Sequence, residues 1–317
     1  MDTRETRPGV ATARPDFDLR AWSTGWLHDV ERALERWVTA DAPAGLDHGA
    51  PAELVQAMRY AVLDGGKRLR PLLVLAACEA VQGDTRAAMR PACAAELIHA
   101  YSLVHDDMPC MDNDVLRRGK ATVHVQFGEA TALLAGDALQ ALAFELLTPE
   151  DAVVPARMQA TWCRLLARAA GSAGMAGGQA IDLASVGCKL SEKQLRDMHR
   201  LKTGALLQGS VMMGAACGPA SAGQAAELAA FGAAVGLAFQ VVDDILDVTA
   251  DSATLGKTAG KDATDHKPTY VSTLGLERSR TFAKELLVQA LAALDRGELP
   301  RPQALCALAH MVVDRSS

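Results

Sequence analysis

Apolar residues recur at three- and four-residue spacing along most of the chain, from about Trp22 onward. This spacing is typical of amphipathic helices, and glycine and proline rather than hairpin signals separate the periodic segments. The pattern predicts helices over residues 53–63, 71–81, 87–108, 129–147, 155–170, 191–216, 223–248, 277–295 and 302–314. The sequence has no glycine-rich linker and no repeat with a period of roughly 20 to 50 residues. We therefore expect an all-α fold with one domain over residues 21–317, preceded by a disordered tail over residues 1–20.

The composition agrees with a helical fold. Hydrophobic residues make up 50% of the chain but aromatic residues only 4%, so the apolar mass is mainly Ala, Leu and Val rather than the mixture typical of sheets. The longer apolar runs are too short, or are broken by a charge, to cover the ~20 residues that a membrane-spanning helix needs. We therefore expect no membrane span.

The charge and the cysteines limit the partners and the compartment. A net charge of -6 gives no broad attraction for nucleic acid, so we expect no nucleic-acid partner. Seven cysteines are scattered without a CxxC pair, which does not suit a disulfide framework. The first 20 residues lack the apolar centre of a signal peptide. These features favour a cytoplasmic protein.

An aspartate-rich motif, DDILD, lies near the end of the helix predicted over 223–248. Asp243 and Asp247 are four residues apart and share a helix face, and Gln240 extends that face one turn back. The preceding residues are apolar, so unpaired like charges on this helix would be costly, and a bound cation would offset them. An oxygen-only ligand set favours a hard ion such as Mg²⁺. The alternative is a solvated helix end.

A second acidic motif, HDDMPCMDND, ends the helix predicted over 87–108. Asp106 and Asp112 are six residues apart, about 240° around a regular helix, so Pro109 must help to distort the backbone if both bind one ion cluster. His99 and Ser102 lie on the Asp106 face, two turns and one turn upstream. A single histidine on such a helix is more often a core residue, but its alignment with Asp106 favours a role in the site.

The chain also supplies cations in loops that contain glycine or proline, among them the GGKRLRP segment at 65–71. Arginine binds phosphate in a bidentate manner and lysine acts as a point charge. Two acidic motifs for Mg²⁺ and several such cations indicate substrates that carry diphosphates. The sequence has no GxxxxGKS/T loop, which argues against a P-loop nucleotide enzyme.

Several long motifs occur in one order and resemble those of the trans-type prenyl diphosphate synthases, especially the bacterial farnesyl diphosphate synthases. They are GGKRLRP at 65–71, HAYSLVHDDMPCMDNDVLRRG at 99–119, GEATALLAGDAL at 128–139, GGQAIDL at 177–183, KTGAL at 202–206, FQVVDDILD at 239–247 and GKTAGKD at 256–262. The resemblance covers most of the chain. It implies an all-α fold around a deep central cavity, with one acidic motif on each of two walls, and usually a homodimer.

The resemblance also implies roles for individual residues. Metal ligands for Mg²⁺, with Mn²⁺ as the alternative ion, would be Asp106, Asp112 and Asp243, supported by Asp107, Asp182, Asp244 and Asp247. Isopentenyl diphosphate would be held by Lys67, Arg70, His99 and Arg118. The allylic diphosphate would be held by Arg117, Lys202, Thr203, Gln240, Lys257 and Lys267. Among these, the catalytic oxygens facing the allylic carbocation would be those of the Lys202 carbonyl, the Thr203 hydroxyl and the Gln240 amide.

The expected reaction is Mg²⁺-assisted ionisation of an allylic diphosphate, dimethylallyl or geranyl diphosphate, followed by attack of the isopentenyl double bond. In this family the positions just before the first aspartate motif line the pocket for the growing chain. Tyr101 is bulky there and Ser102 lies next to it, so the sequence predicts (2E,6E)-farnesyl diphosphate as the product. The alternative for Tyr101 is ordinary core packing.

Three other functions fit parts of the sequence. A geranylgeranyl diphosphate synthase would have the same motifs and a longer product. A class I terpene cyclase would ionise a prenyl diphosphate without binding isopentenyl diphosphate, and the GGKRLRP segment argues against it. A regulatory subunit without activity would be expected to lose one acidic motif, and both motifs are present.

Overall fold

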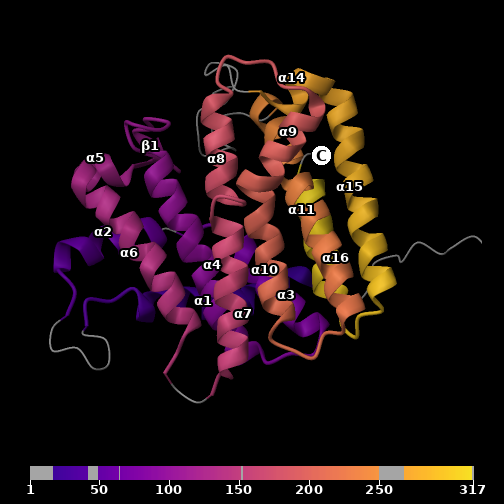
Figure 1. Ribbon diagram of the computed structural model, residues 1–317, viewed down its shortest axis with the longest axis horizontal. Coiled ribbons are helices and arrows are strands. Elements are labelled where there is room, and N and C mark those ends of the chain that lie inside the picture. Colours follow the sequence, from indigo (N-terminus) through magenta and orange to yellow (C-terminus); the bar gives the residue numbers. More distant parts are fainter. Residues whose placement is uncertain (1–16, 42–48, 64, 151–152, 250–267, 316–317) are drawn as a thin grey trace, which may run out of the picture.

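The computed structural model describes residues 17–41, 49–63, 65–150, 153–249 and 268–315. Helices dominate the described chain, as Figure 1 shows, and the all-α prediction is confirmed. The elements are α1 (Leu19–Trp37), α2 (Ala52–Val62), α3 (Leu69–Ala80), α4 (Thr85–Asp106), β1 (Leu116–Arg117), β2 (Lys120–Ala121), α5 (Val123–Phe127), α6 (Glu129–Leu147), α7 (Ala156–Ala170), α8 (Met175–Ala184), α9 (Glu192–His199), η1 (Arg200–Gly204), α10 (Ala205–Ala215), α11 (Ala222–Thr249), α14 (Tyr270–Leu274), α15 (Leu276–Gly297) and α16 (Gln303–Asp314).

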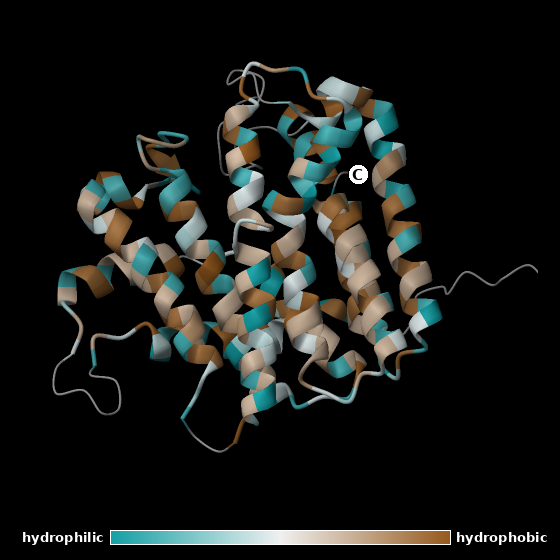
Figure 2. Cartoon of the chain, in the orientation of Figure 1, coloured by the Kyte–Doolittle hydropathy of each residue, from teal (hydrophilic) through white to brown (hydrophobic). Residues whose placement is uncertain are grey.

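The central helices form a row in which each packs on the next. Helix α4 packs on α3, α3 on α10, and α10 on α11, while α6 covers the outer side of α4 and α15 covers α11. Two clusters of buried side chains hold this row together, one around α4 and α6 and one around α11 and α15. Figure 2 shows hydrophobic residues along the inner helices and hydrophilic patches along the outer helix α15. The acidic ends of α4 and α11 therefore belong to helices fixed by the core.

The N-terminal helix begins earlier than the sequence predicts. Asp18 caps α1, because its side chain accepts a hydrogen bond of 2.9 Å from the backbone N–H of Ala21. Trp22 and Trp26 then donate their indole N–H groups to the carboxylate of Glu79, at 2.9 and 3.1 Å, and so tie α1 to α3. The predicted tail over 1–20 is therefore too long by at least two residues, and residues 1–16 lie outside the described chain.

The helix predicted over 191–216 is three elements. Helix α9 ends at His199, a π-helix covers Arg200–Gly204, and α10 follows. A further correction concerns the loop predicted over 109–121, which contains the short β1–β2 hairpin. Helices α5, α8 and α14 are also absent from the predicted set, and most of the predicted loop over 249–268 lies outside the described residues.

Two described helices, α6 and α11, are long and apolar enough to cross a membrane by length and composition alone. Interior helices of a domain meet the same criteria. Helix α11 packs between α10 and α15, which accounts for its apolar character, and α6 packs on α4 but exposes Leu133 and Leu134. The absence of a membrane span stays a prediction.

Candidate active site

The first acidic wall is the C-terminal end of α4 and the turn that follows. The helix ends at Asp106, and the turn containing Pro109 folds back so that the backbone N–H of Asp112 donates to the carbonyl oxygen of Asp106 at 2.8 Å. The distortion expected at Pro109 therefore places the two residues side by side. Burial raises the pKa of Asp106 to about 6, Lys202 opposes this rise, and Asp112 adds to it. An added cation would favour the charged form of Asp106.

Asp107 points away from this pair and binds the hairpin. Its buried carboxylate accepts from Nε and Nη2 of Arg117, at 2.8 to 3.0 Å from Nε and 2.6 Å from Nη2. This bidentate pair fixes the hairpin against α4. In the hairpin, Arg118 has a positive φ of 52° and donates through Nη1 to the carbonyl oxygen of Gly65 at 2.8 Å. A β-carbon on Gly66 would lie 2.8 Å from that same nitrogen, so the double glycine makes room for Arg118.

Basic groups converge between the start of α3 and the face of α4. Burial lowers the pKa of His99 well below its usual value, and the positive charges of Arg70 and Arg118 lower it further, so the ring is neutral at pH 7. The Nε of Arg70 is buried and has no hydrogen-bond partner among the described residues. Most of the Lys67 residue surface is exposed, but partial desolvation and the charge of Arg315 lower the pKa of its ammonium group. The positive charges of Arg70 and Arg118 thus act on the neutral His99, as expected for a group of side chains that binds an anion.

Arg68, within the same GGKRLRP segment, has a different task. Its side chain is buried and forms ion pairs of 2.7 Å with Glu31 and 2.8 Å with Glu96, and it donates to the carbonyl oxygen of Val62. Its backbone adopts the left-handed conformation, φ 44°, directly before α3. Arg68 therefore locks the segment to α1 and α4, and leaves its neighbours Lys67 and Arg70 to face the site.

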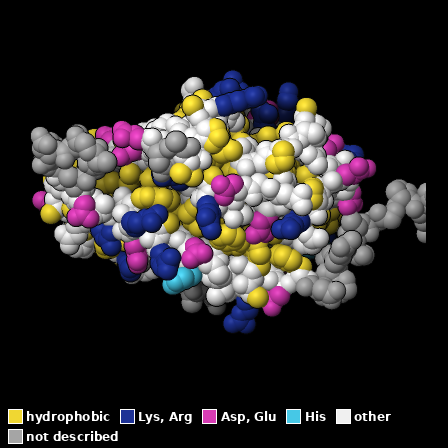
Figure 3. All heavy atoms as spheres, turned by 90° about the horizontal axis from the view of Figure 1, so that it is seen from below, with side chains coloured by type: hydrophobic (Ala, Val, Ile, Leu, Met, Phe, Trp, Pro, Cys, Tyr) yellow, Lys and Arg dark blue, Asp and Glu magenta, His cyan; other side chains and the backbone are white. Residues whose placement is uncertain are grey.

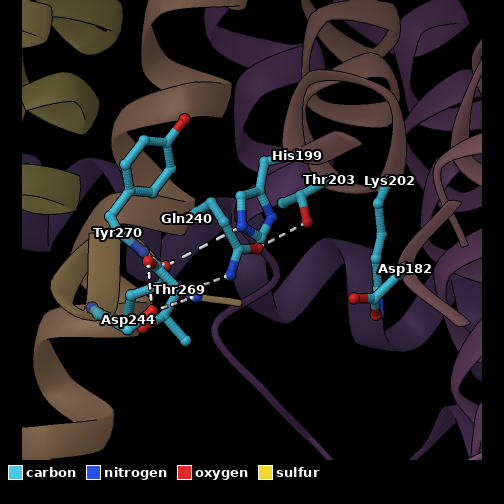
Figure 4. A network of polar contacts seen from close by, with 9 residues as sticks. Asp182, His199, Lys202, Thr203, Gln240, Asp244, Thr269 and Tyr270 are labelled. Carbon is cyan, nitrogen blue, oxygen red and sulfur yellow. Dashed lines mark hydrogen bonds and ion pairs between the residues drawn. The ribbon is translucent and has the colours of Figure 1, made fainter. Parts of the chain in front are cut away.

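The second acidic wall lies on α11 (Figure 4). The Gln240 amide nitrogen donates to Asp244 at 2.9 Å, which leaves the amide oxygen to accept from the hydroxyl of Thr203 at 2.8 Å. The other oxygen of Asp244 accepts from the backbone N–H of Tyr270 at 2.8 Å. Asp244 and Asp247 are buried, and Asp243 is half-buried. Asp244 thus orients Gln240, and Asp243 is the carboxylate best placed to meet a ligand.

The π-helix presents the polar groups opposite α11. Lys202 forms an ion pair with the buried Asp182 of α8, and Thr203 is the next residue. Backbone contacts hold the π-helix: a β-carbon on Gly178 would lie 2.1 Å from the backbone nitrogen of Lys202, and one on Gly236 would lie 2.8 Å from the α-carbon of Gly204. Single-turn π-helices often occur at functional sites, since they interrupt the regular i to i−4 bonding.

Two side chains at this site were not predicted from the sequence. Arg315, after α16, lies 3.6 Å from Asp243 and its guanidinium stands 4.5 Å from the centre of the Phe239 ring. His199 is buried, stacks on Tyr270 and lies 4.0 Å from Asp244, and burial lowers its pKa to about 4. No sequence signal marked Arg315, because it is over 70 residues from Asp243 in the chain.

Some predicted residues are not in these networks. Lys257 and Lys267 lie outside the described residues. Tyr101 is half-buried and its ring meets the ring of His105 edge to face, with centroids 5.7 Å apart. The Ser102 hydroxyl donates to the carbonyl oxygen of His99 in its own helix at 2.9 Å. Their predicted roles in chain length stay predictions.

The predicted metal ligands fit Mg²⁺ only together with a substrate. Among the described residues, no three His, Cys, Asp or Glu side chains are close enough to share one metal ion. Asp106 and Asp112 lie on one wall and Asp243 on the other. Mg²⁺ keeps several waters and binds through one or two carboxylates plus substrate phosphates, so separate carboxylates facing a diphosphate suit it.

A cavity of about 870 Å³ lies elsewhere, between α1 and the N-terminal half of α4. Its lining includes Trp26, Trp37, Arg36 and Arg90, and the guanidinium groups of both arginines stand over the Trp37 ring. Figure 3, which views the molecule from below, shows basic side chains among hydrophobic ones. None of the acidic motif residues lines this cavity, so it is separate from the candidate active site at the acidic ends of α4 and α11.

The fold and this site define an all-α enzyme that acts on diphosphates. The polyprenyl synthetase family matches residues 51–299. A probable farnesyl diphosphate synthase of Sinorhizobium fredii is 50% identical over 277 residues, 86% of this chain and 81% of that protein. A chloroplastic geranylgeranyl pyrophosphate synthase of Catharanthus roseus is 44% identical over 302 residues, 95% of this chain and 82% of that protein.

A solved structure, the geranyltransferase of Helicobacter pylori complexed with magnesium and isoprenyl diphosphate, has a TM-score of 0.79 and 33% identity, covering 95% of this chain and 98% of that one. The chain belongs to the polyprenyl synthetase family and is a prenyltransferase. The family uses Mg²⁺. Its relatives include both farnesyl and geranylgeranyl diphosphate synthases, so the family alone does not fix the product length.

Proposed function

We propose that this prenyltransferase condenses isopentenyl diphosphate with dimethylallyl and geranyl diphosphate and releases (2E,6E)-farnesyl diphosphate. The observation that carries the product length is Tyr101, a half-buried aromatic residue on α4, five residues or about 7.5 Å before Asp106 at 1.5 Å per residue. A chain that grows from a diphosphate at Asp106 along α4 would meet this ring. A geranylgeranyl product would require an open pocket at that depth.

In this proposal the two substrates bind to separate groups. Lys67, Arg70, neutral His99 and Arg118 hold isopentenyl diphosphate, and Arg117 and Lys202 hold the allylic diphosphate. Mg²⁺, or Mn²⁺ in its place, would be held by Asp106, Asp112 and Asp243 and would neutralise charge on the departing diphosphate. The convergence of positive charge on His99 supports the first group.

The oxygens of the π-helix and α11 stabilise the positive charge that develops on the allylic carbon. Thr203 and Gln240 are already joined by a hydrogen bond, and Asp244 keeps the Gln240 oxygen on the Thr203 side. Such preorganised dipoles act without reorganisation during the reaction. The isopentenyl double bond then attacks the allylic carbon, and a proton leaves the new chain, for which the released diphosphate is the nearest base in the proposed arrangement.

The test is a product assay. Purified protein is incubated with Mg²⁺, labelled isopentenyl diphosphate and each allylic primer, and the products are separated by chain length. We expect a fifteen-carbon product, and Tyr101→Ala should shift it to twenty carbons or more. A wild-type product of twenty carbons would refute the proposal, and an active Tyr101→Ala variant that still stops at fifteen carbons would remove Tyr101 from chain-length control.

The assembly and compartment are also part of the proposal. Helix α6 exposes Leu133 and Leu134, with 46% and 55% of their surfaces accessible, which supports a homodimer through this face. The cysteines Cys78, Cys93, Cys110, Cys163, Cys188, Cys217 and Cys306 are free thiols, which supports a reducing cytoplasm. Light scattering coupled to size exclusion tests the dimer, and a monomer at micromolar concentration would refute it.

A further inference from the structure

His105 lies where α4 crosses α6, directly before the first metal-binding aspartate. Its Nε2 is 3.1 Å from the carbonyl oxygen of Leu133 on α6. Because a carbonyl oxygen only accepts hydrogen bonds, Nε2 must carry the hydrogen in this contact. The imidazole is therefore tied to the backbone of the neighbouring helix.

Gly136 provides the space that this ring occupies. A β-carbon on Gly136 would lie 2.0 Å from Nε2 of His105, 2.5 Å from Cδ2 and 2.8 Å from Cε1. These distances are far below any real contact of a β-carbon, so His105 fills the volume that a side chain at position 136 would need. The imidazole is held by Leu133 and Gly136 together.

The same imidazole contacts Tyr101, one turn earlier on the same face of α4. The two ring centroids are 5.7 Å apart and the ring planes are inclined at 74°, the edge-to-face arrangement that aromatic pairs favour. No hydrogen bond to the Tyr101 hydroxyl occurs among the described residues. The orientation of the Tyr101 ring therefore depends on packing, and His105 is its aromatic neighbour.

We propose that His105 is a positioning residue for product length, which holds the Tyr101 ring across the elongation pocket while α6 holds His105. The inference rests on the proposed function, in which Tyr101 closes that pocket. Without the imidazole, Tyr101 keeps its size but can turn to another rotamer, and a growing prenyl chain can push it aside. Product length is then set by the crossing of α4 and α6 as well as by Tyr101.

The first experiment measures the ratio of products longer than fifteen carbons to the fifteen-carbon product in His105→Ala and His105→Gln. The glutamine amide can still donate to the Leu133 carbonyl but has no ring. We expect both variants to raise the ratio, by about three- to tenfold, the range given by the strength of an edge-to-face pair. If His105→Ala fails to fold, His105→Gln carries the same test. A folded, active variant with the wild-type ratio overturns the proposal.

A double-mutant comparison separates the positioning of Tyr101 by His105 from a general structural role of His105. In a Tyr101→Ala background, His105→Gln should leave the product ratio unchanged, because the group that it positions is gone. A further increase in that background would show that His105 acts independently of Tyr101, and would overturn the proposal.

Gly136→Ala tests the same contact from α6. The methyl group should displace the imidazole and raise the ratio in the wild-type background, and should have no further effect when His105 is already alanine. Gln140 is exposed one turn later on α6, so Gln140→Ala is the matched control and should keep the wild-type product ratio. Additive effects of Gly136→Ala and His105→Ala would contradict the proposal. The two proposals fail in different ways. A wild-type product of twenty carbons refutes the farnesyl assignment, whereas the His105 proposal is tested by the change in product ratio between variants.

Discussion

Gly178→Ala is expected to disable the enzyme although glycine at this position contacts no substrate in the proposed site. Gly178 lies on α8 against the π-helix that carries Lys202 and Thr203. A β-carbon there would lie 2.1 Å from the backbone nitrogen of Lys202 and 2.5 Å from its α-carbon, whereas ordinary contacts of a β-carbon begin at 3.4 Å. Both neighbours are backbone atoms, so no side chain can turn away, and α8 and the π-helix must separate.

The structure suggests a small effect on stability and a large one on turnover. Overpacking of this kind costs about 1–3 kcal/mol, and the higher helix propensity of alanine offsets up to about 1 kcal/mol. A chain of this size loses roughly 2–4 °C of melting temperature per kcal/mol, so the melting temperature should fall by a few degrees. A shift of the Lys202 carbonyl and the Thr203 hydroxyl by about 1 Å should lower kcat by about 100-fold.

The assay compares Gly178→Ala with Gly223→Ala, a helical glycine whose β-carbon would meet only the Ser221 hydroxyl at 3.8 Å. Thermal melts report stability, and incorporation of labelled isopentenyl diphosphate reports kcat. We expect Gly223→Ala to match the wild-type protein in both. If Gly178→Ala turns over at the wild-type rate, the π-helix does not depend on this contact and the assignment of its oxygens to catalysis loses its structural basis.

Four further variants test the site. Asp106→Ala and Asp243→Ala should each lower kcat by about 100-fold or more with unchanged circular dichroism, and excess chelator should abolish wild-type turnover; normal turnover would remove that aspartate from the site. Arg315→Ala removes a cation 3.6 Å from Asp243, so it should lower the Mg²⁺ concentration for half-maximal activity several-fold, and an increase would contradict this reasoning. The pKa of His199 is about 4 when folded and about 6.5 when unfolded, so its contribution to stability is present above pH 6.5 and is lost as the pH falls toward 4. His199→Phe should remove up to about 3 kcal/mol of that pH dependence in urea titrations, and an unchanged slope would refute it.

The long helices were predictable because their buried apolar residues recur in the sequence at the three- and four-residue spacing of a helix face. The helix predicted over 129–147 coincides with α6, and that over 223–248 differs from α11 by one residue at each end. The break at the π-helix was not predictable, because it depends on contacts of Lys202 and Gly204 with α8 and α11, far away in sequence. Helix α1 was missed as well, since it is fixed by indole contacts with Glu79.

The candidate site was predictable in its chemistry but less so in its geometry. The motifs indicate carboxylates and cations, but spacing does not show which cation faces the substrate. Within GGKRLRP, Arg68 forms ion pairs with Glu31 and Glu96, whereas the Nε of Arg70 is buried and has no hydrogen-bond partner among the described residues. That difference depends on the left-handed backbone of Arg68, which turns its side chain into the core.

Four glycines explain how neighbouring helices approach closely enough to bring the polar groups of the site together. Packed helices are normally 8–10 Å apart, with side chains between them. At Gly178 and at the pair Gly204 and Gly236, backbones instead approach within the volume of a β-carbon, and the π-helix lies between those contacts. At Gly136 the space is taken by the imidazole of His105. These four glycines therefore bring the π-helix and the His105 imidazole closer to neighbouring helices than side chains would allow. Substituting any of them should change catalysis or product length before it unfolds the protein.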